Sequence, residues 1–185
     1  MIRVTAGVYR GRRVFTGNAL KARPAISVVR ESVFNVLRAH MPVEGVNVCD
    51  ICCGSGAFAF EALSRGAEHA CLVDIHLPNL QLVKRTADSL GVGHKTTILC
   101  CDVHKLPPAD RSYDLAFVDP PYEEASLIDV SLNAMLGMRW CRAGSIVVLR
   151  VNRGTEVSIP QCCELLSRKS YCGSEILFMR TILGD

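Results

Sequence analysis

Short apolar runs alternate with segments of helical periodicity along most of this chain. Apolar runs bounded by turn residues predict buried strands, whereas apolar positions three and four residues apart predict helices. Alternation of the two is typical of a parallel, doubly wound α/β sheet. We expect strands near 46–51, 70–73, 96–101, 114–118 and 143–150, and helices near 57–65, 78–90 and 123–137.

The first forty residues predict an extension outside this alternation. Residues 2–6 and 13–16 predict a short hairpin around Gly11. A helix should follow, because Pro24 suits a first turn and apolar residues then recur near helical spacing. We expect Arg30 to lie away from the buried stripe of this helix, which consists of Ile26, Val29, Val33, Val36 and Leu37.

At the other end, residues 164–171 and 175–182 flank Gly173 and predict a closing antiparallel hairpin. A chain of 185 residues with 49% hydrophobic content can bury a core of its own. We therefore expect one domain over residues 1–185, with a basic extension at 1–40 and a core at 41–185. With no long apolar run and no signal-peptide pattern, we expect a cytoplasmic protein without contact to a membrane. We also expect a monomer.

Ten cysteines need an explanation. Six of them are adjacent pairs, and neighbouring side chains on a strand point to opposite faces, which makes the pairs poor disulfide partners. We expect reduced thiols that pack as small hydrophobes. Cys49 and Cys52 have C-x-x-C spacing, but no second such pair or paired histidines complete a site, so we expect no metal.

Charge is distributed unevenly. Residues 1–40 have a net charge of +7, the remainder has −4, and the whole chain has +3. A basic segment on a mildly acidic body suits a nucleic-acid partner, because phosphate contacts supply affinity without reading sequence. A solubilising basic surface is the alternative. The predicted substrate contacts are Arg10, Arg12, Arg13, Arg23 and Arg30.

A glycine-containing turn, Gly54-Ser55-Gly56, lies between the first core strand and its helix. Glycines there let a ligand approach the backbone closely, and the helix N-terminus offers unpaired N–H groups. Asp50, Asp74 and Asp102 lie at the ends of three successive strands. Because ligands of open α/β sheets lie across the carboxyl ends of the strands, these acids predict a binding edge.

Two ligands suit this edge. A dinucleotide would use Gly54, Gly56 and Ala59 as its glycine fingerprint, with Asp74 on a ribose. S-adenosylmethionine fits better, because it has no pyrophosphate and its cationic groups suit carboxylates. We expect Asp74 at the ribose hydroxyls, Asp102 at the adenine amino group and Asp50 at the methionine end. The predicted cofactor site comprises Asp50, Cys52, Gly54, Gly56, Asp74, Ile75, Asp102 and Val103.

Asp119-Pro120-Pro121-Tyr122 directly follows the strand predicted at 114–118. The Asp119 carboxylate and the Pro120 carbonyl can accept the two hydrogens of an exocyclic amino group, while the Tyr122 ring stacks on the base. A plain strand-terminating turn is the alternative. We predict Asp119, Pro120 and Tyr122 as the catalytic residues.

These motifs resemble those of known proteins. The stretch from Asp50 to Gly56 matches the D-x-x-x-G-x-G motif of class I methyltransferases, and the stretch from Asp119 to Tyr122 matches their D-P-P-Y motif. Residues 7–12, 23–24, 30–37 and 54–67 are similar to the RsmD family of bacterial 16S ribosomal RNA guanine-N2 methyltransferases. Ala25, Asp74 and Cys52-Cys53 depart from the family's usual Thr, Glu and Phe-Ala.

The resemblance implies a Rossmann-like, mostly parallel seven-stranded sheet with S-adenosylmethionine as cofactor. It implies as substrate the N2 amino group of a guanine in 16S rRNA, either naked or within an assembled or partly assembled small subunit. Two alternatives stay open. The D-P-P-Y motif also serves DNA adenine-N6 methyltransferases, and a catalytically silent RNA-binding or ribosome-assembly protein could keep the same fold.

Overall fold

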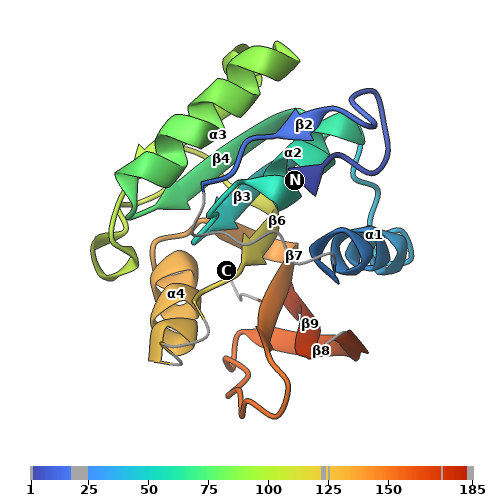
Figure 1. Ribbon diagram of the computed structural model, residues 1–185. Coiled ribbons are helices and arrows are strands. Elements are labelled where there is room, and N and C mark those ends of the chain that lie inside the picture. Colours follow the sequence, from blue (N-terminus) through green and yellow to red (C-terminus); the bar gives the residue numbers. More distant parts are fainter. Residues whose placement is uncertain (1, 18–24, 122–123, 125, 172, 183–185) are drawn as a thin grey trace.

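A computed structural model describes residues 2–17, 25–121, 124, 126–171 and 173–182 (Figure 1). Its large sheet has seven strands in the order β5-β4-β3-β6-β7-β9-β8, which confirms the predicted α/β class. The first five strands in this order are parallel, and β9 is antiparallel to both of its neighbours, β7 and β8. The strands are β3 (Asn47–Ile51), β4 (His69–Asp74), β5 (Thr96–Cys100), β6 (Tyr113–Val118), β7 (Cys141–Asn152), β8 (Cys163–Tyr171) and β9 (Ser174–Thr181).

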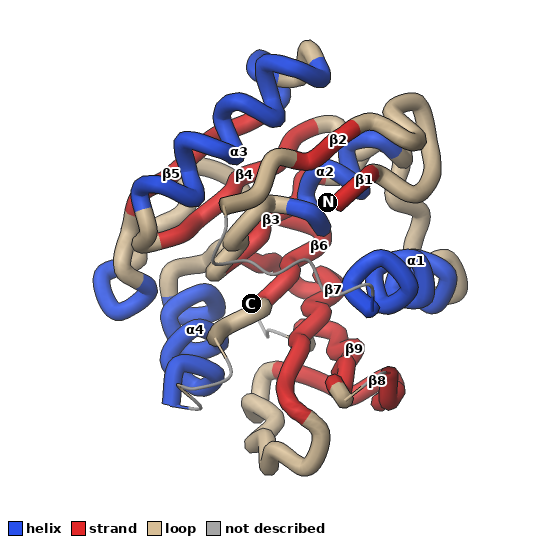
Figure 2. The backbone as a smooth tube through the Cα atoms, in the orientation of Figure 1, coloured by secondary structure: helices blue, strands red, loops and turns tan. Residues whose placement is uncertain are grey.

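Helices cover both faces of this sheet (Figure 2). Successive strand residues point to opposite faces, so Val48 packs in one core and Cys49 in the other. The first core includes residues of α1 (Ala25–Leu37), α2 (Ala57–Ser64) and α3 (Leu77–Leu90). The second includes residues of α4 (Ser126–Gly137) and the short 3-10 helix η2 (Val103–Lys105). Cover on both faces explains the nearly uninterrupted apolar runs of the central strands.

The N-terminal extension forms the predicted hairpin, with shorter strands than expected. β1 (Ile2–Arg3) and β2 (Arg13–Val14) pair antiparallel, with Ile2 opposite Val14. Their connecting loop lies against α2, because the amide of Val8 donates to the Ser64 carbonyl at 2.8 Å. Gly7 has φ +84°, and a Cβ there would lie 1.8 Å from the Ser64 carbonyl oxygen. Only glycine allows the loop to come this close to α2.

Arg30 corrects one prediction. It lies in the core rather than on the exposed face of α1, with 0% of its surface accessible. Its Nε is 3.1 Å from Oε2 of Glu61, and its Nη2 donates to the Arg3 carbonyl. The amphipathic pattern of one helix assigns an arginine to solvent because lone charges are rarely buried. It carries no information on a carboxylate that lies on another helix.

The C-terminal hairpin is also confirmed. β8 and β9 pair antiparallel across Gly173, which has φ +86°. β9 also pairs with β7, whose twelve residues extend the strand expected at 143–150 in both directions. Trp140 precedes β7 and stacks on Tyr113 at 5.3 Å between ring centroids. Within the described chain, no helix is both long and apolar enough to cross a membrane.

Candidate active site at the carboxyl edge of the sheet

Four acids gather where neighbouring strands of the sheet end. Asp74 is the last residue of β4, Asp50 lies near the end of β3, and Asp119 and Asp102 follow β6 and β5 closely. Backbone hydrogen bonds join these strand ends: the amide of Asp119 donates to the Ile51 carbonyl at 3.2 Å. The four acids therefore lie along one edge of the sheet, and Asp119 begins the Asp119-Pro120-Pro121-Tyr122 motif there.

The glycine turn between β3 and α2 has one closed side and one open side. A Cβ at Gly56, where φ is +69°, would lie 2.4 Å from Cδ2 of Leu72, so packing requires glycine there. A Cβ at Gly54, where φ is +54°, would meet no described atom within 4 Å. The open side at Gly54 leaves the backbone accessible to a ligand.

Asp50 is the most deeply buried acid at this edge, with 1% exposure. Its Oδ2 accepts the amide of Ala59 at 3.2 Å, whereas no described donor reaches Oδ1. Burial raises the pKa of Asp50 well above its usual range, and the charges of Asp119 and Asp74 add to this effect. A buried carboxylate oxygen without a partner suits a cationic or N–H group of a ligand. The position of Asp50 at the methionine end of S-adenosylmethionine stays a prediction.

The carboxylates of Asp74 and Asp102 accept hydrogen bonds from backbone amides of the loops around them. Asp74 accepts the amide of Gly54 at 2.7 Å and that of His76 at 2.8 Å, and Asp102 accepts the amide of His104 at 3.0 Å. A carboxylate oxygen has a second lone pair, so these acids can also accept ligand hydroxyl or amino groups. Beside them, Ile75 is 67% exposed and offers an apolar surface to a flat ring, while Val103 is buried beneath the edge.

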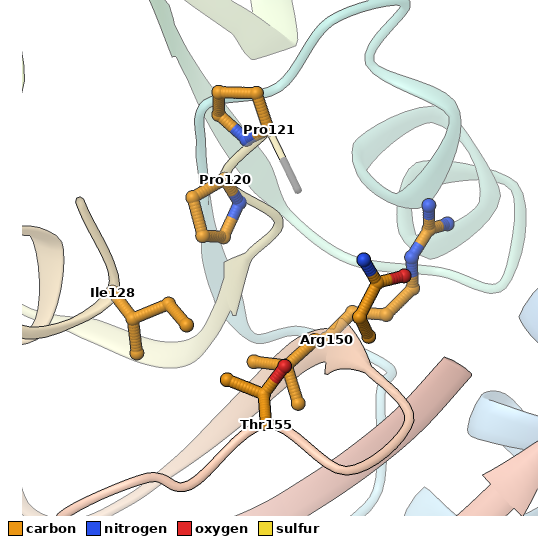
Figure 3. Close-up of a pocket in the computed structure, with 7 residues that line it drawn as sticks. Pro120, Pro121, Ile128, Arg150 and Thr155 are labelled. Atoms are coloured by element: carbon orange, nitrogen blue, oxygen red, sulfur yellow. The ribbon is translucent and has the colours of Figure 1, made fainter. Parts of the chain in front are cut away.

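The structure describes only part of the Asp119-Pro120-Pro121-Tyr122 motif. Asp119 has a side chain 24% exposed, and its Oδ1 lies 3.1 Å from Nε of Arg150 on β7. Burial raises the pKa of Asp119, and the positive charge of Arg150 opposes the rise. Pro120, Pro121 and Arg150 line a narrow hollow at this edge (Figure 3). Tyr122 lies outside the described residues.

Sequence reasoning missed Arg150, because nothing in the apolar run of β7 distinguishes it. Only the pairing of β6 with β7, which places Val118 opposite Leu149, brings it beside Asp119. The register of two strands separated by a helix cannot be obtained from a local pattern.

Cys52 occupies the turn with φ +59°, and its Sγ lies 4.0 Å from Oγ of Ser131. Burial raises the pKa of this thiol to about 12, so it stays protonated at neutral pH and is a poor nucleophile. The nine cysteines in the described ranges are free. No group of three or more potential metal ligands occurs among the residues that the structure describes.

The predicted phosphate contacts separate into different environments. Arg10, Arg12 and Arg13 are exposed on the hairpin, and Arg12 Nη2 donates to the Ser89 carbonyl of α3 at 2.6 Å. The guanidinium groups of Arg13 and Arg85 lie 4.8 and 4.2 Å from the Phe15 ring centre. The hairpin and α3 thus present their arginines on one surface. Arg30 is buried and takes no part in it, and Arg23 lies outside the described ranges.

The sequence and the fold of this chain are similar to those of known proteins. The family model described as Conserved hypothetical protein 95 matches residues 2–180. Ribosomal RNA small subunit methyltransferase D of Escherichia coli K12 is 31% identical over 140 residues, which are 75% of this chain and 69% of that protein. The protein of the same name from Haemophilus influenzae is 27% identical over 177 residues, 91% of this chain and 88% of its own. The solved structure of yhhF from Escherichia coli shares the fold, with a TM-score of 0.86, 21% identity and 99% coverage of both chains.

Proposed function

Because this chain belongs to the RsmD family, we propose that it is an S-adenosylmethionine-dependent methyltransferase of the N2 amino group of a guanine in 16S rRNA. One observation carries the proposal. β3 and β6 are adjacent and parallel, with Ile51 opposite Val118, so the glycine turn that follows one strand and the Asp119-Pro120 motif that follows the other lie side by side. A methyl donor at the first and an amino acceptor at the second would meet at this edge.

The residues present fit S-adenosylmethionine, which when bound supplies an electrophilic methyl group on its sulfonium sulfur. The open backbone at Gly54 admits the cofactor, and the partnerless Oδ1 of Asp50 suits its cationic end. Asp74 would accept the ribose hydroxyls and Asp102 the adenine amino group. Ile75 would provide an apolar contact to the adenine ring, and Val103, which is buried, would support this part of the cofactor site from below.

Asp119 and Pro120 act on the acceptor amine. The nitrogen lone pair of guanine N2 is delocalised into the ring, which makes it a poor nucleophile. The Asp119 carboxylate and the Pro120 carbonyl would accept its two N–H groups and direct the lone pair toward the methyl group. Well-oriented reactants can gain about 7 to 11 kcal/mol from positioning. The burial that raises the pKa of Asp119 also makes it a better acceptor for the proton that the methylated amine releases.

The RNA would be held by the N-terminal extension, residues 1–40, while residues 41–185 form the catalytic core. The exposed hairpin residues Arg10, Arg12 and Arg13 would contact phosphates without reading sequence. Arg23, which belongs to the same basic segment, would extend these contacts. Flipping the target base out of its stack costs a few kcal/mol, and stacking on Tyr122 would return about 1 to 3. We propose a cytoplasmic monomer whose substrate is 16S rRNA, naked or in an assembled or partly assembled small subunit.

Two substitutions of Asp119 test this function. Asp119→Ala should abolish methyl transfer yet leave S-adenosylmethionine affinity within a few fold, because Asp119 faces the acceptor. Asp119→Asn keeps one acceptor oxygen, so residual turnover would indicate that orientation suffices, and none would indicate that the charge is required.

The assay would compare transfer of a labelled methyl group to 16S rRNA, assembled small subunits and duplex DNA. Labelled guanine N2 in the RNA products, and none in DNA, is the expected result. Labelled adenine N6 in DNA would identify the alternative enzyme. Binding of S-adenosylmethionine without transfer to any of these substrates would refute the proposed reaction, and no binding at all would favour a silent RNA-binding protein.

A further inference from the structure

We infer that Arg150 is a positioning residue, which holds the Asp119 carboxylate in the orientation that receives the acceptor amine. This inference rests on the proposed function. Because Val118 pairs with Leu149, the residues that follow them, Asp119 and Arg150, lie side by side at the carboxyl ends of β6 and β7. The two side chains are only 24% and 16% exposed, so the ion pair between them is partly shielded from water.

The contact orients the carboxylate asymmetrically. Nε of Arg150 lies 3.1 Å from Oδ1 of Asp119, an ion-pair contact that lacks the geometry of a hydrogen bond, and Oδ2 takes no part in this pair. The guanidinium therefore holds one oxygen and leaves the other for an N–H of the substrate. Figure 3 shows the Arg150 side chain extending from β7 away from Thr155, with the Pro120 and Pro121 rings across the hollow. A guanidinium suits this function, because it stays charged at every pH at which the enzyme would be assayed.

The positive charge of Arg150 also keeps Asp119 in the ionised form that can accept the amine hydrogen. Asp50 and Cys52 face Asp119 from β3 and its turn, Asp74 lies beyond them on β4, and Arg150 faces it from β7. Burial raises the pKa of Asp119, and Arg150 is the cation that lowers it. Without Arg150, the carboxyl group should take up a proton at a higher pH. A protonated Asp119 has one less oxygen with which to accept the amine hydrogen.

A second ion pair between β6 and β7 provides a control variant for Arg150→Met. Arg142 and Asp114 form an ion pair near the amino ends of β7 and β6, at the opposite edge of the sheet. Arg142→Met removes an arginine from the same strand and breaks a pair between the same two strands, far from the strand ends that form the site. Any effect that Arg150→Met shares with Arg142→Met is therefore structural.

The first experiment measures the pH dependence of kcat for the wild type and for Arg150→Met, Arg150→Lys and Arg142→Met. At neutral pH, kcat of Arg150→Met should fall about 10- to 100-fold, as expected for a displaced reacting group. Its acid limb should shift to higher pH, because kcat reports the groups of the bound complex. Arg150→Lys should restore the acid limb and part of the rate, and Arg142→Met should match the wild type. An acid limb that stays in place in Arg150→Met would overturn the inference.

The second experiment does not need turnover. The carboxyl resonance of Asp119, followed by NMR with ¹³C-labelled aspartate, should titrate at higher pH in Arg150→Met than in Arg142→Met, with both variants folded. An unchanged Asp119 titration would refute the role of Arg150 even if all variants were active. A shifted titration in a protein that methylates no RNA would instead refute the proposed function and leave the Arg150–Asp119 coupling established.

Discussion

Replacing Glu61 with glutamine should strongly destabilise the protein. Glu61 is a buried hub on α2, with a fully covered side chain. Its carboxylate accepts the amide and hydroxyl of Thr5 at 2.8 and 2.6 Å and the amide of Ala6 at 3.0 Å. It also pairs with Arg30 at 3.1 Å and with Arg65 at 2.9 Å. Glutamine has nearly the same shape but removes the charge that these donors share.

The expected loss follows from the partner that remains. Arg30 would stay buried without a counter-charge, and breaking a buried ion pair in this way costs about 3 to 5 kcal/mol. That is a large share of the roughly 5 to 15 kcal/mol that stabilises a typical domain. At about 2 to 4 °C per kcal/mol for a chain of this size, the melting temperature should fall by about 6 to 20 °C.

Urea unfolding can be followed through Trp140, the single tryptophan, which is buried. Glu68→Gln is the matched control, because it breaks the exposed pair with Lys95 and should cost at most about 1 kcal/mol. Adding Arg30→Met to Glu61→Gln should recover part of the loss, since both charges are then gone. A free energy of unfolding for Glu61→Gln equal to that of Glu68→Gln would show that the buried pair is not stabilising.

The pH dependence gives an independent check. Burial alone would raise the pKa of Glu61, but the hydrogen bonds from Thr5 and the charge of Arg30 outweigh it, so the pKa lies below its ordinary value of 4.5. The stabilisation from Glu61 is therefore complete above that value and is lost as the pH falls through the lower, folded-state pKa. The stability difference between the wild type and Glu61→Gln should shrink in that acidic range.

Three further predictions concern the site. Gly56→Ala should lower the melting temperature more than Gly54→Ala: both backbones have positive φ, but only at Gly56 would the Cβ clash with Leu72. Gly54→Ala should in addition weaken S-adenosylmethionine binding; calorimetry and melting curves showing the reverse order would contradict the assignment of the open side. Asp50→Asn should raise the melting temperature, increasingly as pH rises, because the raised pKa of Asp50 means that its ionised form costs stability there. The same change should weaken cofactor binding by about 1.5 to 3 kcal/mol, and unchanged affinity would exclude Asp50 from the site. The last prediction replaces the three hairpin arginines, Arg10, Arg12 and Arg13, together by alanine. In a salt titration, the slope of log RNA affinity against log salt concentration should become shallower by about 0.7 to 0.9 per lost phosphate contact. Superimposable slopes for the wild type and the variant would exclude these arginines from the RNA interface.

Features encoded within short segments could be predicted from the sequence, and features that depend on packing could not. The strands, the glycine turn and the acids at strand ends follow from local patterns, so Asp50, Asp74 and Asp119 lie at the expected edge. Arg30 was placed on the wrong face because its partner is 31 residues away, on another helix. Arg150 was missed because its meaning depends on which residue of β6 it lies beside.

The attachment of the N-terminal hairpin to α2 fixes the distance between the hairpin and the glycine turn. Glu61 and Ser64 hold the N-terminal segment near one end of this eight-residue helix, and the glycine turn precedes its other end. At 1.5 Å per residue this helix is a rigid spacer about 12 Å long. A hairpin attached to a rigid helix cannot change its distance from the site to fit RNAs of different shapes. An RNA held by the hairpin would deliver a base to the site only if its own fold sets the gripped phosphates and that base at the matching separation. Substrate selection would then depend on the three-dimensional shape of the RNA rather than on its base sequence.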